Sequence, residues 1–110
     1  RGRADTLYTA QRWAELSRED PVPAYLVGRM LYQLESFEEA ERWLSSAVHL
    51  PDPDLREERG LTLARARYLT GDLDGADQSF SALLQVSSDR IRGAAEDGRA
   101  RIAWKRDSGQ

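Results

Sequence analysis

The stretch AYLVGRMLYQLESFEEAERWLSSAVHL, residues 24–50, contains a spacing of small and large side chains that occurs twice along the chain. In this stretch Gly28 is followed by Ala40 and then by Leu44. At an offset of 36 residues (76 − 40 = 36), the equivalent places hold Ala64, Ala76 and Phe80. Small residues let two helices approach closely while large ones interlock around them. The spacing therefore predicts two copies of one helix-turn-helix unit, as in stacked helical arrays.

Length and composition favour one helical domain. The chain has 110 residues, of which 40% are apolar and 32% are charged. Its net charge of −3 gives no electrostatic case for general nucleic-acid binding, and no apolar run approaches the length that spans a bilayer. Cysteine is absent, which excludes disulfides and thiolate catalysis. Because the chain opens with RGRAD and not with Met, we expect it to be a piece of a longer protein.

The periodicity of apolar residues predicts an all-α fold of about six antiparallel helices, with no strand pattern. One helix is expected ahead of the two units and one after them, giving the ranges 3–18, 24–50, 54–86 and 89–106. Pro21 and Pro23 are expected to form a tight connection before the first unit. Ser36 and Glu39 have the spacing of a capping box.

Further helix ends are expected in the second half of the chain. A helix is expected to start at Asp54, because aspartate is a preferred residue at helix N-termini. Gly71 is expected to take a left-handed conformation just past a helix end, and Asp72 to cap a helix that reaches about Val86. The last helix is expected to be capped from Ser87, Ser88 and Asp89.

These residues resemble the tetratricopeptide repeat (TPR), a helix-turn-helix unit of about 34 residues. The family's small, large and terminating positions match Gly28, Ala40, Leu44, Ala47 and Pro51 in the first unit, and Ala64, Leu73, Ala76 and Phe80 in the second. Arg67 departs from the pattern, because it takes the place of a buried apolar residue and so suggests loose packing. Gly98, 34 residues after Ala64, is assigned the place of Gly28 in a third copy. The resemblance implies a TPR-like solenoid.

The resemblance also implies a concave groove lined by the first helix of each unit. The residues expected there are Tyr25, Arg29 and Tyr32, then Leu61, Arg65 and Tyr68, then Ala95, Arg99 and Ile102. The three arginines are expected to stack and to hold an acidic segment of a partner protein. The alternative is that each arginine pairs internally with an acid such as Glu58 or Glu96.

We therefore expect a non-catalytic protein–protein interaction scaffold. The family's chaperone-binding members use a lysine and asparagine set, which this face lacks, so no co-chaperone role is expected. A periplasmic exopolysaccharide export scaffold is a compatible setting, favoured over a cytoplasmic one, with only indirect membrane association. The alternative is a structural spacer or self-association module, because the face bearing Ile91, Ala95 and Ile102 is expected to be uncovered at the chain's end.

Three weaker patterns point to chemistry. His49 with Ser45 and Ser46 has the spacing of a base and nucleophile, but a helix C-terminus also favours a cation there. The run from Asp72 to Asp77 is similar to a calcium loop but lacks its final acid. The last helix carries a basic and aromatic group that is also ordinary for a helix C-terminus, namely Arg99, Arg101, Trp104, Lys105 and Arg106. No catalytic site, metal, cofactor or nucleic-acid partner is expected.

Overall fold

The computed structural model describes residues 3–86 and 88–109, and the side chains of residues 5–86 and 88–109. This part of the chain is all-helical and contains no strand, which confirms the predicted all-α class. Its helices are α1 (Arg3–Leu16), α2 (Pro21–Gln33), α3 (Phe37–Ser46), α4 (Pro53–Thr70), α5 (Leu73–Ala82) and α6 (Asp89–Asp107), with a short 3-10 helix at Leu83–Gln85. None of the helices in this part is both long and apolar enough to cross a bilayer.

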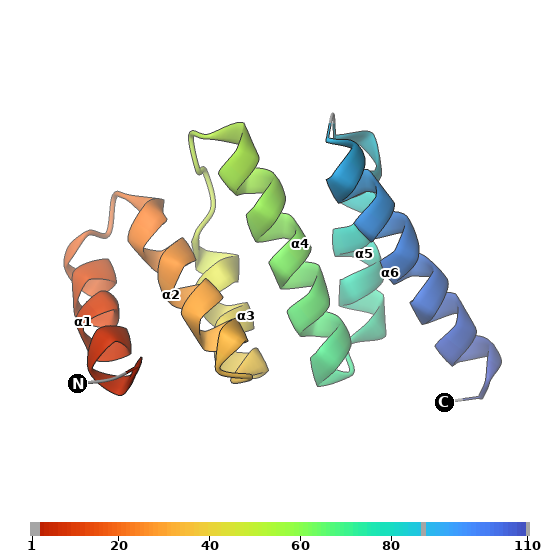
Figure 1. Cartoon of the computed structure of the whole chain (residues 1–110), viewed down its shortest axis with the longest axis horizontal. Helices are drawn as coiled ribbons and strands as arrows, with labels where there is room; N and C mark the ends of the chain where they lie inside the picture. The colour runs from red at the N-terminus through yellow and green to blue at the C-terminus, as the bar shows by residue number, and fades with distance from the viewer. Residues whose placement is uncertain (1–2, 87, 110) are drawn as a thin grey trace.

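The helices form two layers (Figure 1). In the layer that faces the viewer, α2, α4 and α6 lie side by side in chain order, and α3 and α5 lie behind them. At the N-terminal end, α1 packs on α2.

Two apolar cores lie on either side of α4. The first core is built from α1, α2 and α3, and Leu63 of α4 belongs to it. The second is built from α5 and α6, and it takes Leu61 and Ala64 from α4. Because α4 contributes side chains to both cores, it joins the two halves of the molecule.

The small residues of the quoted pattern lie where helices meet. Ala40, Ala64 and Ala76 are fully buried. A Cβ atom on Gly28 would lie 2.6 Å from Cγ of Leu44, so only glycine lets α2 approach α3 this closely. The small residue Gly28 therefore packs against the large residue of the quoted pattern, Leu44.

Several predicted helix ends are confirmed. Gly71 has a φ of 92° and ends α4 in the left-handed conformation. The Asp72 carboxylate accepts a hydrogen bond of 2.9 Å from the Gly75 amide at the start of α5. The Ser88 hydroxyl accepts one of 3.2 Å from the Ile91 amide at the start of α6, while Ser87 lies outside the described residues.

Two predicted helix starts are wrong. The pair Pro21 and Pro23 does not form a connection, because α2 begins at Pro21 and both prolines lie in its first turn. Proline fits there since the first-turn amides have no partner inside the helix. Proline also fits the first turn of α4, so this helix begins at Pro53, earlier than predicted. Asp52, not Asp54, caps it, because the Asp52 carboxylate accepts a 2.9 Å hydrogen bond from the amide of residue 54.

Two further corrections concern α3 and α5. The Ser36 side chain makes no capping hydrogen bond, and its amide already donates to the Leu31 carbonyl at 2.9 Å, so Glu39 has no free donor to reach. The predicted end of α5 near Val86 is also too late. The α-helix ends at Ala82, and the chain tightens into the 3-10 turn that follows.

The apolar face of α6 is covered. Ile91, Ala95 and Ile102 are each no more than 1% exposed, because they pack against α4 and α5 in the second core. The prediction that this face is left open is therefore wrong. The large apolar side chain that α6 does expose is that of Trp104.

Two loops are held in the same way by arginines at the predicted offset of 36 residues. The guanidinium of Arg56 donates to the Leu50 carbonyl at 2.8 Å, in the loop before α4. Arg92 (92 − 56 = 36) donates to the Val86 carbonyl at 2.7 Å, in the loop before α6. The offset of 36 residues therefore relates equivalent positions of α4 and α6.

Candidate functional site

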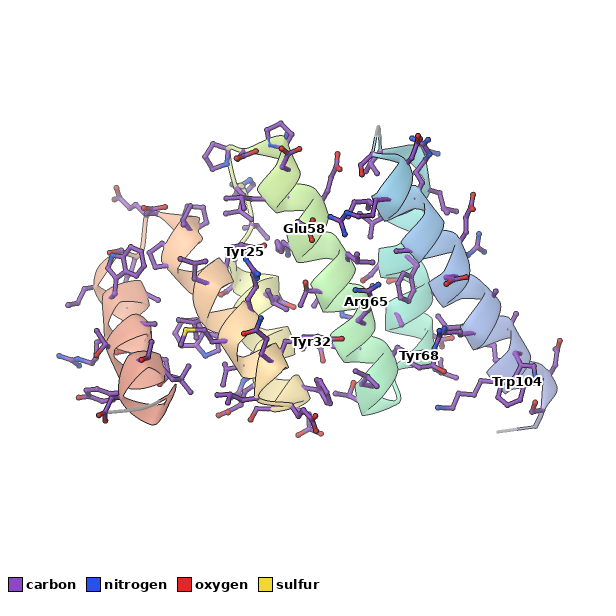
Figure 2. The ribbon with its side chains drawn as sticks, viewed as in Figure 1. Tyr25, Tyr32, Glu58, Arg65, Tyr68 and Trp104 are labelled. Atoms are coloured by element: carbon purple, nitrogen blue, oxygen red, sulfur yellow. The ribbon has the colours of Figure 1, made fainter. Side chains whose placement is uncertain are left out.

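A cavity of about 280 Å³ lies between α4 and α6 and reaches α2. Figure 2 shows Arg65 and Tyr68 on α4 and Tyr32 on α2, all in the layer formed by α2, α4 and α6. The cavity is lined by Tyr32, Arg65, Tyr68, Leu69, Phe80, Ala94, Asp97, Gly98 and Arg101. It therefore combines aromatic rings, two guanidinium groups and an apolar floor.

The two guanidinium groups of the cavity are uncommitted. Arg65 and Arg101 are exposed, and neither forms an ion pair or hydrogen bond with any residue in the described part of the chain. Other arginines on the same two helices are paired with acids, since Arg67 of α4 pairs with Glu41 at 3.1 Å and Arg99 of α6 pairs with Asp77 at 3.0 Å. The donors of the cavity arginines are consequently available to a ligand.

Both tyrosine rings of the cavity are held by neighbours. The Tyr32 ring packs edge-on against Phe37, with ring centroids 5.3 Å apart. The Lys105 ammonium lies 4.9 Å from the centroid of the Tyr68 ring. Both contacts are of kinds that attract, so each favours the ring position seen in the cavity.

The floor depends on a close approach of α6 to α5. Gly98 faces the Phe80 ring so closely that a Cβ atom at this position would overlap it. Phe80 is 3% exposed and forms part of the apolar lining of the cavity. Asp97 is the one acidic residue among those that line the cavity.

The predicted groove residues divide into three groups. Tyr32, Arg65 and Tyr68 line the cavity. Tyr25 and Leu61 do not, because they are 1% and 2% exposed and belong to the two cores. Arg29 is exposed on α2, and its guanidinium lies 5.7 Å from the centroid of the Tyr25 ring.

The third predicted set, Ala95, Arg99 and Ile102, does not line the cavity. Arg99 turns toward α5 and pairs with Asp77, while Ala95 and Ile102 are buried in the second core. The arginine that α6 places in the cavity is Arg101, which the sequence analysis assigns only to a basic patch. The signal was present in the sequence, since Arg101 follows Arg65 at the offset of 36 (101 − 65 = 36), whereas Gly98 suggested an offset of 34.

Of the three arginines expected to stack, Arg99 pairs with an acid, and that acid is Asp77 and not Glu58 or Glu96. Glu58 pairs instead with Arg90 of α6. Much of the basic patch on α6 is paired as well, because Arg106 contacts Asp74 and Asp77 of α5.

The aspartates of the calcium-like run take structural roles, whereas Ser46 ends α3 and His49 lies in the loop after it. His49 has a φ of 65° in the loop after α3, and the Ser46 hydroxyl donates to the Trp43 carbonyl at 2.8 Å. Asp72 is the cap of α5, and Asp74 and Asp77 pair with arginines of α6. Within the described residues, no group of three or more His, Cys, Asp or Glu side chains is placed to hold a metal ion.

One partly buried cation contacts the end of α3. Burial lowers the pKa of Arg59, and the charge of Arg67 lowers it further. The Arg59 Nε nevertheless donates a 2.7 Å hydrogen bond to the Leu44 carbonyl in the last turn of α3. The same carbonyl also accepts a 3.2 Å hydrogen bond from the Ala47 amide, so Arg59 adds a second donor to the C-terminal end of α3.

Comparisons of this chain with protein-family models, with curated proteins and with solved structures found no match.

Proposed function

We propose that this chain is a non-catalytic interaction module that captures an acidic segment of another protein in the cavity between α4 and α6. The observation that carries the proposal is the pair of unpaired guanidinium groups, Arg65 and Arg101, in one cavity with Tyr32 and Tyr68. Guanidinium binds carboxylate through two parallel hydrogen bonds, and the adjacent rings supply apolar contact area.

The proposed architecture is a TPR-like solenoid whose groove is formed by α2, α4 and α6. The two-layer arrangement in Figure 1 supports it, as do the buried alanines at helix contacts. The matching loop contacts of Arg56 and Arg92 support it as well. Within a solenoid, successive helices present one continuous surface to an extended ligand.

Electrostatics favours an acidic ligand on a chain that is itself acidic. The net charge of −3 repels acidic segments at long range, so attraction must come from a local group of cations. Arg65 and Arg101 supply such a group. Opposite charges across the contact raise the association rate, and added salt weakens the binding.

Selection from a random peptide display library tests the proposal. We expect the selected peptides to be enriched in Asp and Glu. Their dissociation constants, measured by fluorescence anisotropy, should rise with salt concentration. Selected peptides without acidic residues, or binding that is insensitive to salt, would contradict the proposal.

A charge-reversal variant tests the same proposal by removing the positive charge. The double variant Arg29→Glu with Arg65→Glu changes two exposed side chains, so its helical circular dichroism should equal that of the parent. It should lose the selected acidic peptides. If this variant binds them as tightly as the parent, the binding surface lies elsewhere.

A structural spacer or self-association module is the second candidate. It is favoured by large apolar side chains on the outer helices, where Leu16 of α1 is 78% exposed and Trp104 of α6 is 69% exposed. Sedimentation tests it directly. Association that strengthens with concentration and is lost in Leu16→Glu or Trp104→Glu supports this candidate, and a monomer at all concentrations contradicts it.

The proposed setting, a periplasmic export scaffold, rests on composition and on the TPR resemblance. Fractionation of bacteria that produce this protein tests it. Recovery in the cytoplasm would contradict the setting but not the proposed binding.

A further inference from the structure

The offset of 36 residues selects a third pair of groove residues. On α2 and α4, an arginine is followed three residues later by a tyrosine. The same offset leads on α6 to an arginine followed three residues later by a tryptophan, which completes the series Arg29 and Tyr32, Arg65 and Tyr68, Arg101 and Trp104. Residues three apart lie on the same face of a helix. We call these three pairs the rungs.

Packing shows that 36, and not 34, is the offset that relates α6 to α4. Gly28 meets Leu44, which belongs to the helix that follows α2. Gly98 meets Phe80, which belongs to the helix that precedes α6. The two glycines are therefore not equivalent, and the loop contacts of Arg56 and Arg92 independently give 36.

The exposed state of the rungs fits a shared binding face. Arg29, Arg65 and Arg101 are all exposed. The second and third of them line one cavity, together with the ring of the first rung, Tyr32. The rungs lie on α2, α4 and α6, which are neighbours in one layer (Figure 1).

The spacing of the rungs sets the spacing of the ligand. Axes of packed helices lie about 8–10 Å apart. A peptide in the extended polyproline II conformation has three residues per turn and advances about 3.1 Å per residue, so every third side chain returns to the same face about 9 Å further along. A peptide that crosses the three helices thus brings every third residue opposite an arginine.

We propose that the ligand is an extended segment with an acidic residue at every third position, and that Arg101 and Trp104 form the third rung that reads it. This inference rests on the proposed function, because it specifies the acidic segment that the cavity captures. The carboxylates pair with Arg29, Arg65 and Arg101, and the residues between them pack on the aromatic rings.

Two peptides of equal composition test the spacing. One carries Asp at every third position among Gly, Ser and Ala, and the other carries three consecutive Asp residues in the same background. Fluorescence anisotropy at low salt should show tighter binding of the spaced peptide, by about three- to fivefold for each additional rung engaged. Equal binding of both peptides overturns the spacing inference and leaves the proposed function intact. Binding of neither peptide contradicts the proposed function as well.

A matched pair of variants on α6 tests the third rung. Arg101→Gln should weaken the spaced peptide by about three- to fivefold and reduce its advantage over the clustered one. Arg99→Gln removes the same charge from the same helix but changes a side chain committed to Asp77, so it should leave the affinity unchanged. Circular dichroism verifies that both variants are folded. Equal effects of the two variants, or a larger effect of Arg99→Gln, overturn the assignment of Arg101.

Discussion

The Nε atom of Arg67 lies 3.1 Å from the Oε2 atom of Glu41 and joins α4 to α3. A second nitrogen of the same guanidinium donates to the Ser79 hydroxyl of α5 at 2.8 Å. An arginine at a position that the TPR pattern gives to an apolar residue predicts loose packing here. The Arg67 side chain instead bridges α3, α4 and α5, and it is 25% exposed.

A double-mutant cycle on this pair should give measurable coupling. Arg67→Ala and Glu41→Ala should each destabilise the protein, and the coupling free energy should be about 0.5–1 kcal/mol, because the pair is only partly exposed. Urea denaturation of the four proteins measures it. Additive effects within error would show that the bridge adds no stability.

Two glycines of α6 should respond oppositely to alanine. At Gly98 the new Cβ atom meets the Phe80 ring, so Gly98→Ala should destabilise by about 1–3 kcal/mol. At Gly93 nothing lies within 4 Å, so Gly93→Ala should stabilise the helix by about 0.5–1 kcal/mol. Thermal melts of both variants check the signs. A tolerated Gly98→Ala would contradict the close approach of α6 to α5.

Enlarging a buried alanine should be costly where helices cross. Ala40→Leu and Ala76→Leu should each cost about 1–3 kcal/mol, because both sites are fully buried. Ala103→Leu makes the same change at an exposed position of α6 and should be nearly neutral. If all three variants unfold at the parent temperature, the two core assignments are wrong.

Helix ends were predicted well where one residue's own chemistry decides them. Gly71 and Ser88 act within their own turns, so their sequence signals needed no knowledge of packing. Pro21 was misinterpreted because proline both breaks helices and begins them, and the local sequence does not separate the two roles. The missing Ser36 cap has a similar origin, because its amide is taken by the preceding helix.

The third predicted set of residues does not line the cavity, for a reason of packing. A glycine at a helix contact shows that another helix comes close but not which one. The predicted offset of 34 gives Gly98 the place of Gly28, yet Gly98 packs on the helix that precedes its own, whereas Gly28 packs on the helix that follows. The offset of 34 leads from Arg65 to Arg99, and the offset of 36 leads to Arg101. Burial of Tyr25 was likewise not visible in the sequence, since tyrosine is common both in cores and on binding surfaces.

The most direct test of the central claim is a two-dimensional NMR titration that follows the side-chain Nε–Hε signals of the arginines as an acidic peptide with Asp at every third position is added. The account predicts shifts at Arg65 and Arg101, which have no partner among the described residues, and little change at Arg67 and Arg99, which are held by acids. Shifts confined to other arginines, with Arg65 and Arg101 unmoved at saturation, would contradict it.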